Sequence, residues 1–274
     1  MNLRNKLRFV GLSDTGKVRE HNEDTIAVDA DIGLLVLADG MGGYNAGEVA
    51  SGIAVKTIVN LVREHVERED LAVPDRESGL SRPNIILRDA ISRANKIIYQ
   101  TARTQPQCEG MGTTVVAALF FDNKVTIAHV GDSRLYRQRA DKLEQVTMDH
   151  SLLQELVDRG FYSPEEAQRA GNKNYVTRAL GVEQSVDVEI QEIPVSKGEV
   201  FILCSDGLSD MVEDEEIRLT LITLKTNPNL TVQQLVQAAN DNGGRDNISA
   251  MLIRVAEPFG VPRGWFARLK ALFA

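Results

Sequence analysis

Four aspartates stand where predicted strands begin or end, each beside a glycine or a tight polar turn. They are Asp39, Asp132, Asp206 and Asp246. In the first three an apolar run leads into the acid, and in the fourth the acid precedes the run. Antiparallel strands would bring all four carboxylates to one edge of the sheets. Because crowded carboxylates repel one another unless they share protons or bind cations, hard divalent ions with oxygen ligands are the expected solution.

Short motifs rich in glycine and polar residues surround these acids. Each motif alone has a common explanation, because Asp-Gly after a strand is usually a turn. Five motifs in this order are hard to explain as turns. Gly40, Gly42 and Gly43 let the backbone come near a ligand, so a carbonyl there is a candidate metal ligand. The five segments are 13–24 (SDTGKVREHNED), 38–43 (ADGMGG), 131–134 (GDSR), 205–207 (SDG) and 244–249 (GRDNIS).

The composition is that of a globular protein, with 43% hydrophobic and 26% charged residues in a chain of 274. This length fits one large domain or two small ones. The formal net charge of −8 argues against a nucleic-acid partner, which needs a basic surface. Cys108 and Cys204 form no CxxC pair, and the basic N-terminus lacks the apolar stretch of a signal peptide. Since no run approaches the ~18 apolar residues of a membrane helix, we expect a cytoplasmic location.

The first 150 residues predict strands, then two helices, then strands again. Apolar residues at helical spacing predict helices over 46–69 and about 85–101, joined by a polar loop. Asp122 and Asn123 predict a compact hairpin turn. The predicted strands cover 7–12, 25–29, 33–39, 112–121, 124–130 and 134–138.

The pattern changes at His150. Residues 150–181 predict short helices over 151–159 and 164–170, the second with Ser163 as N-cap, Pro164 at the first position and Glu166 at the third. Strands over 186–190 and 199–204, helices over about 213–224 and 231–240, and a strand over 248–255 follow. Because strands and helices do not alternate regularly, the order favours an α+β fold with antiparallel sheets.

Taken together, the strings GxVRxxNED, LADGMGG, GMGTT, GDSR, SDGLSD and GRDNIS resemble the metal-dependent serine/threonine phosphatases of type 2C, the PPM family, and most of all its compact bacterial members. The resemblance covers roughly residues 7 to 255. It implies a β-sandwich of two antiparallel sheets flanked by helices, in a four-layer αββα arrangement. The predicted phosphatase domain spans 7–256 with a flap subdomain at about 150–181, and 257–274 form a C-terminal amphipathic tail.

The resemblance also implies a centre of two manganese or magnesium ions. By similarity, Asp39 bridges the ions and the Gly40 carbonyl binds one of them, while Asp206 and Asp246 bind the other. The remaining implied ligands are Glu23 and Asp24, directly or through water, and Asp132, which with Asp206 would hold a third, weaker ion.

The implied reaction is hydrolysis of phosphoserine or phosphothreonine by direct attack of a hydroxide that bridges the two ions. Two cations ~3.5–4 Å apart stabilise both the attacking and the leaving oxygens of an in-line displacement. Arg19 matches the arginine that grips the substrate phosphate, a role that suits its planar guanidinium.

The proton donor for the leaving group is left open. Many eukaryotic members have a histidine after Asp-Gly, whereas this chain has Met41, which cannot donate a proton. Metal-bound water is the preferred donor. His21 and His150 lie near motifs, but a structural or solvent-facing role is favoured for both; His65 and His129 show no ligand spacing.

Three other functions compete with a type 2C phosphatase. A cysteine phosphatase needs an arginine six positions after its nucleophile, and neither Cys108 nor Cys204 has one. Asp29 and Asp31 resemble the nucleophile loop of haloacid-dehalogenase-type phosphatases, although a hairpin turn explains them better. A pseudophosphatase, a binding module without turnover, would be expected to lose metal acids or the phosphate arginine, and this chain keeps them.

The expected partners are phosphorylated proteins, in particular a serine/threonine kinase and its substrates. The flap is expected either to select among phosphoproteins or to be an ordered surface subdomain. In the tail, Trp265, Phe266, Leu269, Leu272 and Phe273 make an apolar stripe beside basic residues. Such a helix either contacts a partner or a membrane surface, or packs on its own domain, and both alternatives stay open.

Overall fold

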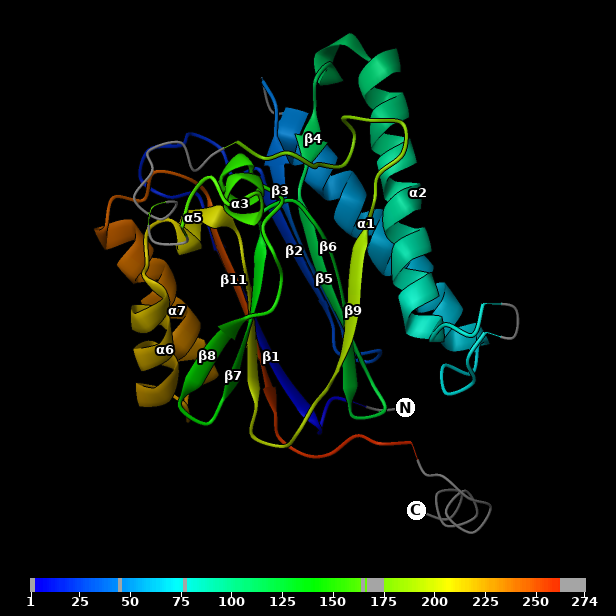
Figure 1. Ribbon diagram of the computed structural model, residues 1–274, viewed down its shortest axis with the longest axis vertical. Coiled ribbons are helices and arrows are strands. Elements are labelled where there is room, and N and C mark those ends of the chain that lie inside the picture. The colour runs from blue at the N-terminus through cyan, green and yellow to red at the C-terminus, as the bar shows by residue number, and fades with distance from the viewer. Residues whose placement is uncertain (1–2, 44–45, 76–77, 164–165, 167–174, 262–274) are drawn as a thin grey trace.

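The computed structural model describes residues 3–43, 46–75, 78–163, 166 and 175–261. Four layers are stacked in the order helices, sheet, sheet, helices (Figure 1). This arrangement confirms the predicted α+β sandwich. No helix in the described ranges is long and apolar enough to cross a membrane.

Two antiparallel sheets form the middle layers. The first consists, in spatial order, of β1 (Leu7–Asp14), β11 (Ile248–Val255), β10 (Val200–Cys204), β7 (Arg134–Arg139) and β8 (Lys142–Gln145). The second consists of β2 (Asp24–Asp29), β3 (Leu34–Met41), β5 (Val115–Phe121), β6 (Lys124–Val130) and β9 (Glu189–Pro194), and the short β4 (Gly112–Thr113) pairs with the end of β3.

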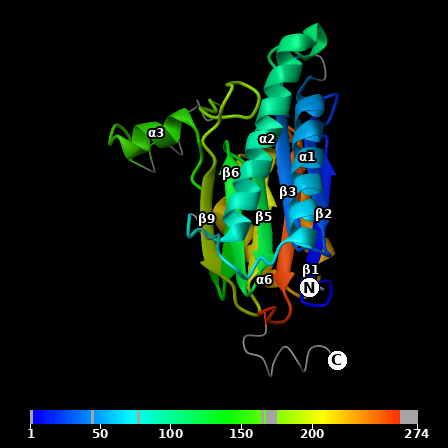
Figure 2. The ribbon, with the colours of Figure 1, turned by 90° about the vertical axis from the view of Figure 1, so that its right-hand side faces the viewer.

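The helices cover the outer faces of both sheets. Two long antiparallel helices, α1 (Ala46–Arg68) and α2 (Arg82–Thr104), lie over β3 and β5, as Figure 2 shows. On the other face lie α5 (Asp206–Ser209), α6 (Asp214–Thr223) and α7 (Pro228–Asp241). The flap helix α3 (Leu152–Asp158) stands clear of the sandwich in Figure 2, and a single 3₁₀ turn covers Pro106–Cys108.

The alternation of apolar residues along the strands creates three separate cores. In β3, Leu34 and Val36 face α1 and α2, whereas Leu35 and Leu37 face the opposite sheet. Successive side chains of a strand point to opposite faces, so one fully apolar strand can serve two cores. A third core lies between the first sheet and α5 to α7. Burial of each such side chain contributes about 1.5–3 kcal/mol, and together they fix the strand ends relative to one another.

The structure departs from the sequence predictions where tertiary contacts decide the boundaries. The predicted strand 112–121 divides at Thr114, whose backbone N–H bonds to Asp39 across from it. Helix α2 starts at Arg82, earlier than predicted, because Pro83 suits a first helical turn. The polar strand β8 was not predicted, and β9 lies at Glu189–Pro194 rather than at 186–190, because pairing with β6 sets its position.

Several local predictions can be compared directly with the structure. Asp122 and Asn123 both have positive φ, 48° and 56°, which confirms the hairpin turn between β5 and β6. Ser163 and Glu166 exchange the two hydrogen bonds of a capping box, although the predicted helix at 164–170 lies largely outside the described residues. The apolar stripe of the tail lies outside them too. Phe259, within the predicted tail, is buried against Phe120 between the sheets.

Candidate functional site

Six acidic side chains lie at one end of the sandwich. Asp24 and Asp39 are direct cross-strand partners in β2 and β3. Asp206 follows β10 and Asp246 precedes β11, and because these strands are antiparallel, both acids lie at the same end. We call this group the acidic edge; it consists of Glu23, Asp24, Asp39, Asp132, Asp206 and Asp246.

Burial, followed by the charges of neighbouring acids, raises the pKa values of Asp24, Asp39, Asp132 and Asp206. Burial is the largest cause for Asp24 and Asp132, whose pKa values rise to about 7, and for Asp206, whose pKa rises to about 6. The pKa of Asp39 is raised well above its usual value by burial and then by the charges of Asp24 and Asp206. The acidic edge therefore needs either protons or cations to be stable near neutral pH.

One arginine faces the acidic edge from the loop between β1 and β2. Arg19 donates a hydrogen bond from Nη2 to Asp246 Oδ2 at 2.7 Å, and its side chain is half exposed. This bond uses one of the five N–H donors of a guanidinium, so Arg19 can hold Asp246 and still bind a further anion. The pKa of Glu23 is raised, mainly by burial, although Arg19 and the Gly47 backbone N–H at the start of α1 oppose the shift.

The donor set fits hard divalent cations. Among the described residues, Asp24 Oδ1 and Asp206 Oδ1 are buried oxygens that accept no hydrogen bond. Such oxygens are costly to bury unless a cation binds them. Among the described residues, the ligand atoms of His129, His150 and Glu189 gather closely enough for a single ion, within 4.8 Å of one another, and the acids form no such ready single-ion cage. A looser carboxylate group suits small divalent ions that keep several water ligands.

The backbone next to Asp39 is held by the Gly-Met-Gly-Thr-Thr segment. The Asp39 carbonyl accepts hydrogen bonds from Thr113 Oγ1 at 2.7 Å and from the Thr114 N–H at 2.9 Å. The Thr114 hydroxyl in turn lies 2.7 Å from Ser133 Oγ, in the turn that carries Asp132. A Cβ atom at Gly40 would lie 2.2 Å from the Gly47 carbonyl oxygen, so only glycine fits there. These motifs thus fix two acids relative to each other.

Asn247 fixes the loop that carries Arg19 and Glu23. Its Oδ1 accepts the Glu23 N–H at 2.8 Å, and its Nδ2 donates to the carbonyls of Thr15 and His21. Sequence reasoning quoted the motif around Asn247 but gave the residue no role. A polar residue directly after an acid and before a buried strand was the available signal.

Ser205 makes a similar link inside the acidic edge. Its hydroxyl donates to Asp24 Oδ2 at 2.8 Å and accepts the Ser249 N–H at 3.0 Å. The hydroxyl is fully buried and connects β10, β11 and β2. This residue was also part of a quoted motif without an assigned role.

A cavity of about 550 Å³ opens beside the acidic edge, between the flap and helices α5 and α6. Asp132 and Asp206 line it from the acidic edge, and Leu153 and Val157 line it from α3. Arg134, bound to Asp149 through both carboxylate oxygens, forms part of its wall. The cavity gives a substrate segment room next to the acids.

The other candidate residues of the sequence lie in structural settings. Asp29 and Asp31 lie at the opposite end of β2, where they pair with Arg63 and Arg4. This placement and the antiparallel sheets argue against a haloacid-dehalogenase nucleophile. Both cysteines are buried, and burial raises the pKa of the Cys204 thiol to about 12, so it is no nucleophile.

Met41 and the two histidines near motifs differ in exposure and in hydrogen bonding. Met41 ends β3, and His21 is exposed on the loop before β2. His150 is buried, and Gly131 and Glu189 occupy its two ring nitrogens.

Comparison with known proteins agrees with this geometry. The family model described as protein phosphatase 2C matches residues 16–252. A serine/threonine phosphatase, stp, of Listeria innocua is 37% identical over 244 residues, covering 88% of this chain and 93% of that protein. The crystal structure of the Mycobacterium tuberculosis serine/threonine phosphatase PstP superposes with a TM-score of 0.80 at 36% identity, covering 92% of this chain and 100% of that one. A second structure, of the PstP catalytic domain in complex with two manganese ions, gives a TM-score of 0.75 at 36% identity over 92% and 99% of the two chains.

The family model spans almost the whole described sandwich and every residue of the acidic edge. The chain therefore belongs to the protein phosphatase 2C family.

Proposed function

We propose that this chain is a metal-dependent protein phosphatase that hydrolyses phosphoserine and phosphothreonine. One observation carries the proposal: acids from five separate segments meet beside Arg19 in a chain of the protein phosphatase 2C family. The Listeria relative is named a serine/threonine phosphatase, and a PstP structure contains two manganese ions. Both findings support manganese or magnesium as the cofactor.

We assign the ligands by their place in the acidic edge. Asp39 would bridge two ions, with the Gly40 carbonyl on one ion and Asp206 and Asp246 on the other. Glu23 and Asp24 would act directly or through water, and Asp132 with Asp206 would hold a third, weaker ion. The unpartnered oxygens of Asp24 and Asp206 support this assignment, as do the raised pKa values of Asp39 and Asp132.

When bound, the two cations supply a nucleophilic water at neutral pH and neutralise charge on the phosphoryl oxygens. The chain's own residues then bind and orient the substrate. Arg19 lies at the rim of the acidic edge, where its remaining N–H donors can meet two phosphate oxygens at once. Its bond to Asp246 holds the guanidinium in place before substrate arrives, which reduces the entropy lost on binding.

The leaving alkoxide still requires a proton. Met41 cannot donate one, and both ring nitrogens of His150 are engaged. Water in the site therefore remains the proposed donor.

We propose phosphorylated proteins, including targets of a serine/threonine kinase, as the substrates. The flap borders the 550 Å³ cavity and exposes Phe161, Tyr162 and Tyr175. Exposed aromatic side chains suit contact with a protein partner. Shortening the flap between Ser151 and Val176, which keeps His150, should therefore reduce hydrolysis of a phosphoprotein more than hydrolysis of a small aryl phosphate; equal losses would count against selection by the flap.

Hydrolysis of para-nitrophenyl phosphate and of a phosphothreonine peptide tests the proposed function. We expect activity with manganese, none with EDTA, and none in Asp206→Ala with manganese. Asp89→Ala removes an exposed acid on α2 and is the matched control, which should keep wild-type activity. A purified protein that binds phosphopeptide but stays inert with manganese would instead indicate a pseudophosphatase.

The cytoplasmic location and the tail at 257–274 stay predictions. Cell fractionation tests the first. Removal of residues 262–274 tests the second, because unchanged sedimentation and unchanged liposome binding would reject a role for the tail in association.

A further inference from the structure

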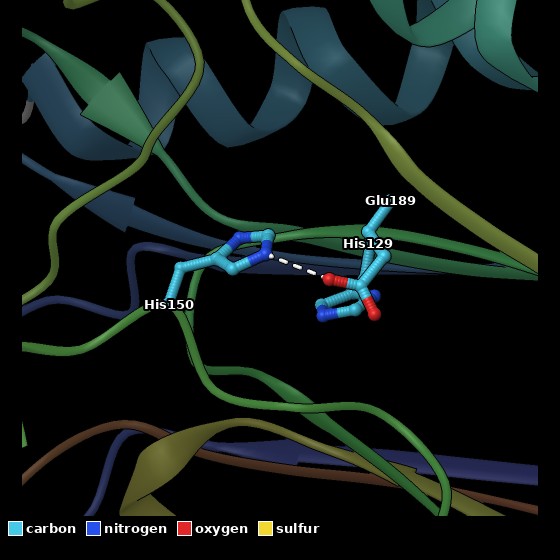
Figure 3. A group of neighbouring side chains, drawn as sticks. All are labelled: His129, His150 and Glu189. Atoms are coloured by element: carbon cyan, nitrogen blue, oxygen red, sulfur yellow. Dashed lines mark hydrogen bonds and ion pairs between the residues drawn. The ribbon is translucent and has the colours of Figure 1, made fainter. Parts of the chain in front are cut away.

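A cluster of two histidines and a glutamate lies outside the acidic edge. His129 is in β6, His150 begins the flap and Glu189 begins β9 (Figure 3). The two rings are buried and stacked, with centroids 4.8 Å apart and planes at 13°. His150 Nε2 lies 3.3 Å from Glu189 Oε2, the contact drawn as a dashed line in Figure 3. Residues of these types often bind a transition metal.

The hydrogen bonds of the two rings argue against a metal ion. The Gly131 N–H donates to His150 Nδ1 at 3.0 Å, so this nitrogen carries the lone pair and the proton lies on Nε2. His129 Nε2 lies 2.8 Å from the Met148 carbonyl, which only accepts, so this nitrogen also carries a proton. Moreover, lone pairs lie in the ring planes, and nearly parallel stacked rings do not aim them at one point. The cluster is therefore built as a hydrogen-bonded support.

The support acts on the turn that carries Asp132. His150 and Gly131 exchange two hydrogen bonds: the Gly131 N–H donates to the ring, and the His150 N–H donates to the Gly131 carbonyl at 3.0 Å. Gly131 has a φ of +109°, and a Cβ there would lie 2.6 Å from Thr114. The turn is thus tightly packed on one side and held by His150 on the other, directly before Asp132.

The same residue anchors the base of the flap. The His150 carbonyl accepts the Thr177 N–H at 2.8 Å, and the next residue, Ser151, forms a bridge with Val176. The two ends of the flap are therefore held together at His150 and Ser151. Consequently, one residue joins three segments: its backbone bonds to the flap base, and its ring bonds to β9 and to the Asp132 turn.

We propose that His150 is a positioning residue whose Nδ1 holds the Gly131–Asp132 turn in the geometry needed for the weakest metal ion. The proposal rests on the proposed function, in which Asp132 with Asp206 binds that ion. His150 itself binds neither metal nor substrate. Residues that orient a ligand in this way commonly change metal affinity by about 10–100-fold when they are replaced.

The surroundings keep His150 in the neutral form that this role requires. Burial lowers its pKa, and the neighbouring His129 and Arg178 lower it further, while Glu189 opposes them. A protonated ring would place an N–H against the Gly131 N–H, so the neutral tautomer and the observed hydrogen bonds are mutually consistent.

Two variants separate the two ring nitrogens. His150→Asn places a side-chain oxygen near the position of Nδ1 and can still accept the Gly131 N–H. His150→Gln reaches the position of Nε2 and loses that acceptor. Glu189→Gln is the matched control, because it removes the charge beside Nε2 and leaves the Gly131 bond intact.

Isothermal titration of the metal-free proteins with manganese chloride provides the primary measurement. We expect His150→Gln to weaken the weakest binding step about tenfold, while His150→Asn and Glu189→Gln stay within about twofold of wild type, as expected when no ligand-orienting bond is lost. The manganese concentration for half-maximal hydrolysis of para-nitrophenyl phosphate should rise in parallel. The tight steps should be unchanged in all variants.

Several results would overturn the proposal. These are a His150→Gln variant with wild-type manganese affinity, equal weakening in the Asn and Gln variants, and a wild-type protein that binds two ions tightly but no third. If His150→Gln does not fold, His150→Ala removes the same acceptor and carries the same expectation. Failure of both to fold while His150→Asn folds would assign His150 to stability alone. A wild-type protein that binds no manganese would refute the proposed function itself.

Discussion

At the end of the sandwich opposite the acidic edge, buried acids meet arginines. Glu199, whose side chain is 4% exposed, accepts hydrogen bonds from Arg137 and Arg139 at 2.6–3.2 Å. Asp29, 3% exposed, lies 2.5 Å from Arg63. At the acidic edge, by contrast, the ion pair found among the described residues joins Arg19 to Asp246.

This contrast shows two ways in which one chain handles buried negative charge. Where the acid serves the fold, guanidinium groups neutralise it, through several hydrogen bonds at Glu199 and through an ion pair at Asp29. Where acids gather without such partners, their pKa values rise, as for Asp24, Asp39 and Asp132. The fold therefore gives up stability at one end and leaves carboxylates available for cations. Substitutions at each end separately should therefore affect different properties, activity at the acidic edge and stability at the opposite end.

The largest effect is expected from Asp39→Ala at the acidic edge. Removing one hydrogen-bond donor from an active site lowers the rate by roughly 10²–10³-fold. Removing the proposed bridging ligand of both ions should lower it further. We expect manganese-dependent hydrolysis of para-nitrophenyl phosphate to fall by more than about 10³-fold. An unimpaired variant would refute the assignment of Asp39.

Arg137→Ala at the opposite end should show the reverse profile. It leaves Glu199 with the more exposed Arg139 as its remaining ion-pair partner among the described residues, and breaking a buried pair costs about 3–5 kcal/mol. We expect urea unfolding to report a loss near the lower value, while kcat/KM of the folded protein stays unchanged. A loss of activity without loss of stability would contradict the division between the two ends.

Asn247→Ala tests whether the loop around Arg19 depends on its anchor. The variant loses three hydrogen bonds to backbone groups, which we expect to lower the free energy of unfolding by about 1–3 kcal/mol. Because Arg19 and Glu23 lose their fixed position, kcat/KM should fall about tenfold, as for other orienting residues.

Asn242→Ala is the matched control for Asn247→Ala. It removes one exposed hydrogen bond to the Met211 carbonyl, and it should change neither the free energy of unfolding nor kcat/KM measurably. Equal behaviour of the two variants would remove the special role of Asn247.

A smaller effect concerns the pH dependence of the metal-free protein. The pKa of Asp24 is about 7 in the folded state and about 3.9 in an unfolded chain. Between these two pH values the folded state keeps the Asp24 carboxyl protonated, whereas the unfolded chain releases the proton. The contribution of Asp24 to stability is therefore lost as the pH rises from about 4 through 7. Asp24→Asn should therefore be more stable than wild type in EDTA at pH 8, by more than about 1 kcal/mol.

Thermal unfolding of both proteins between pH 5 and 8 measures the Asp24 effect. The difference in stability between wild type and Asp24→Asn isolates Asp24, because the contribution of His150 to stability changes with pH in the opposite direction and is common to both proteins. Its lowered pKa makes its contribution decrease as the pH falls below about 6.5. Manganese should reverse the order at pH 8, and a constant difference across the pH range would contradict the shifted pKa of Asp24.

Local sequence patterns predicted most of the strands, the long helices and the acids. Alternating and helical periodicities arise from local geometry, so the strands around Asp39 and Asp206 and the long helices were predictable. Motifs around each acid pointed to a divalent-ion site because oxygen-rich, glycine-lined turns are chemically unusual as a set. The hairpin at Asp122 and Asn123 followed from turn chemistry alone.

How distant residues meet depends on the packing of the sheets and helices. Asn247 lies 224 positions from Glu23 in the chain, and nothing in its local sequence states which loop it holds. His150 likewise became a support for Asp132 only through the packing of β6, the flap base and β9. Spacing along a chain reports local periodicity, whereas hydrogen bonds between separate segments depend on how the sheets and helices pack. For that reason the acids were readable from sequence and the residues that hold them in place were not.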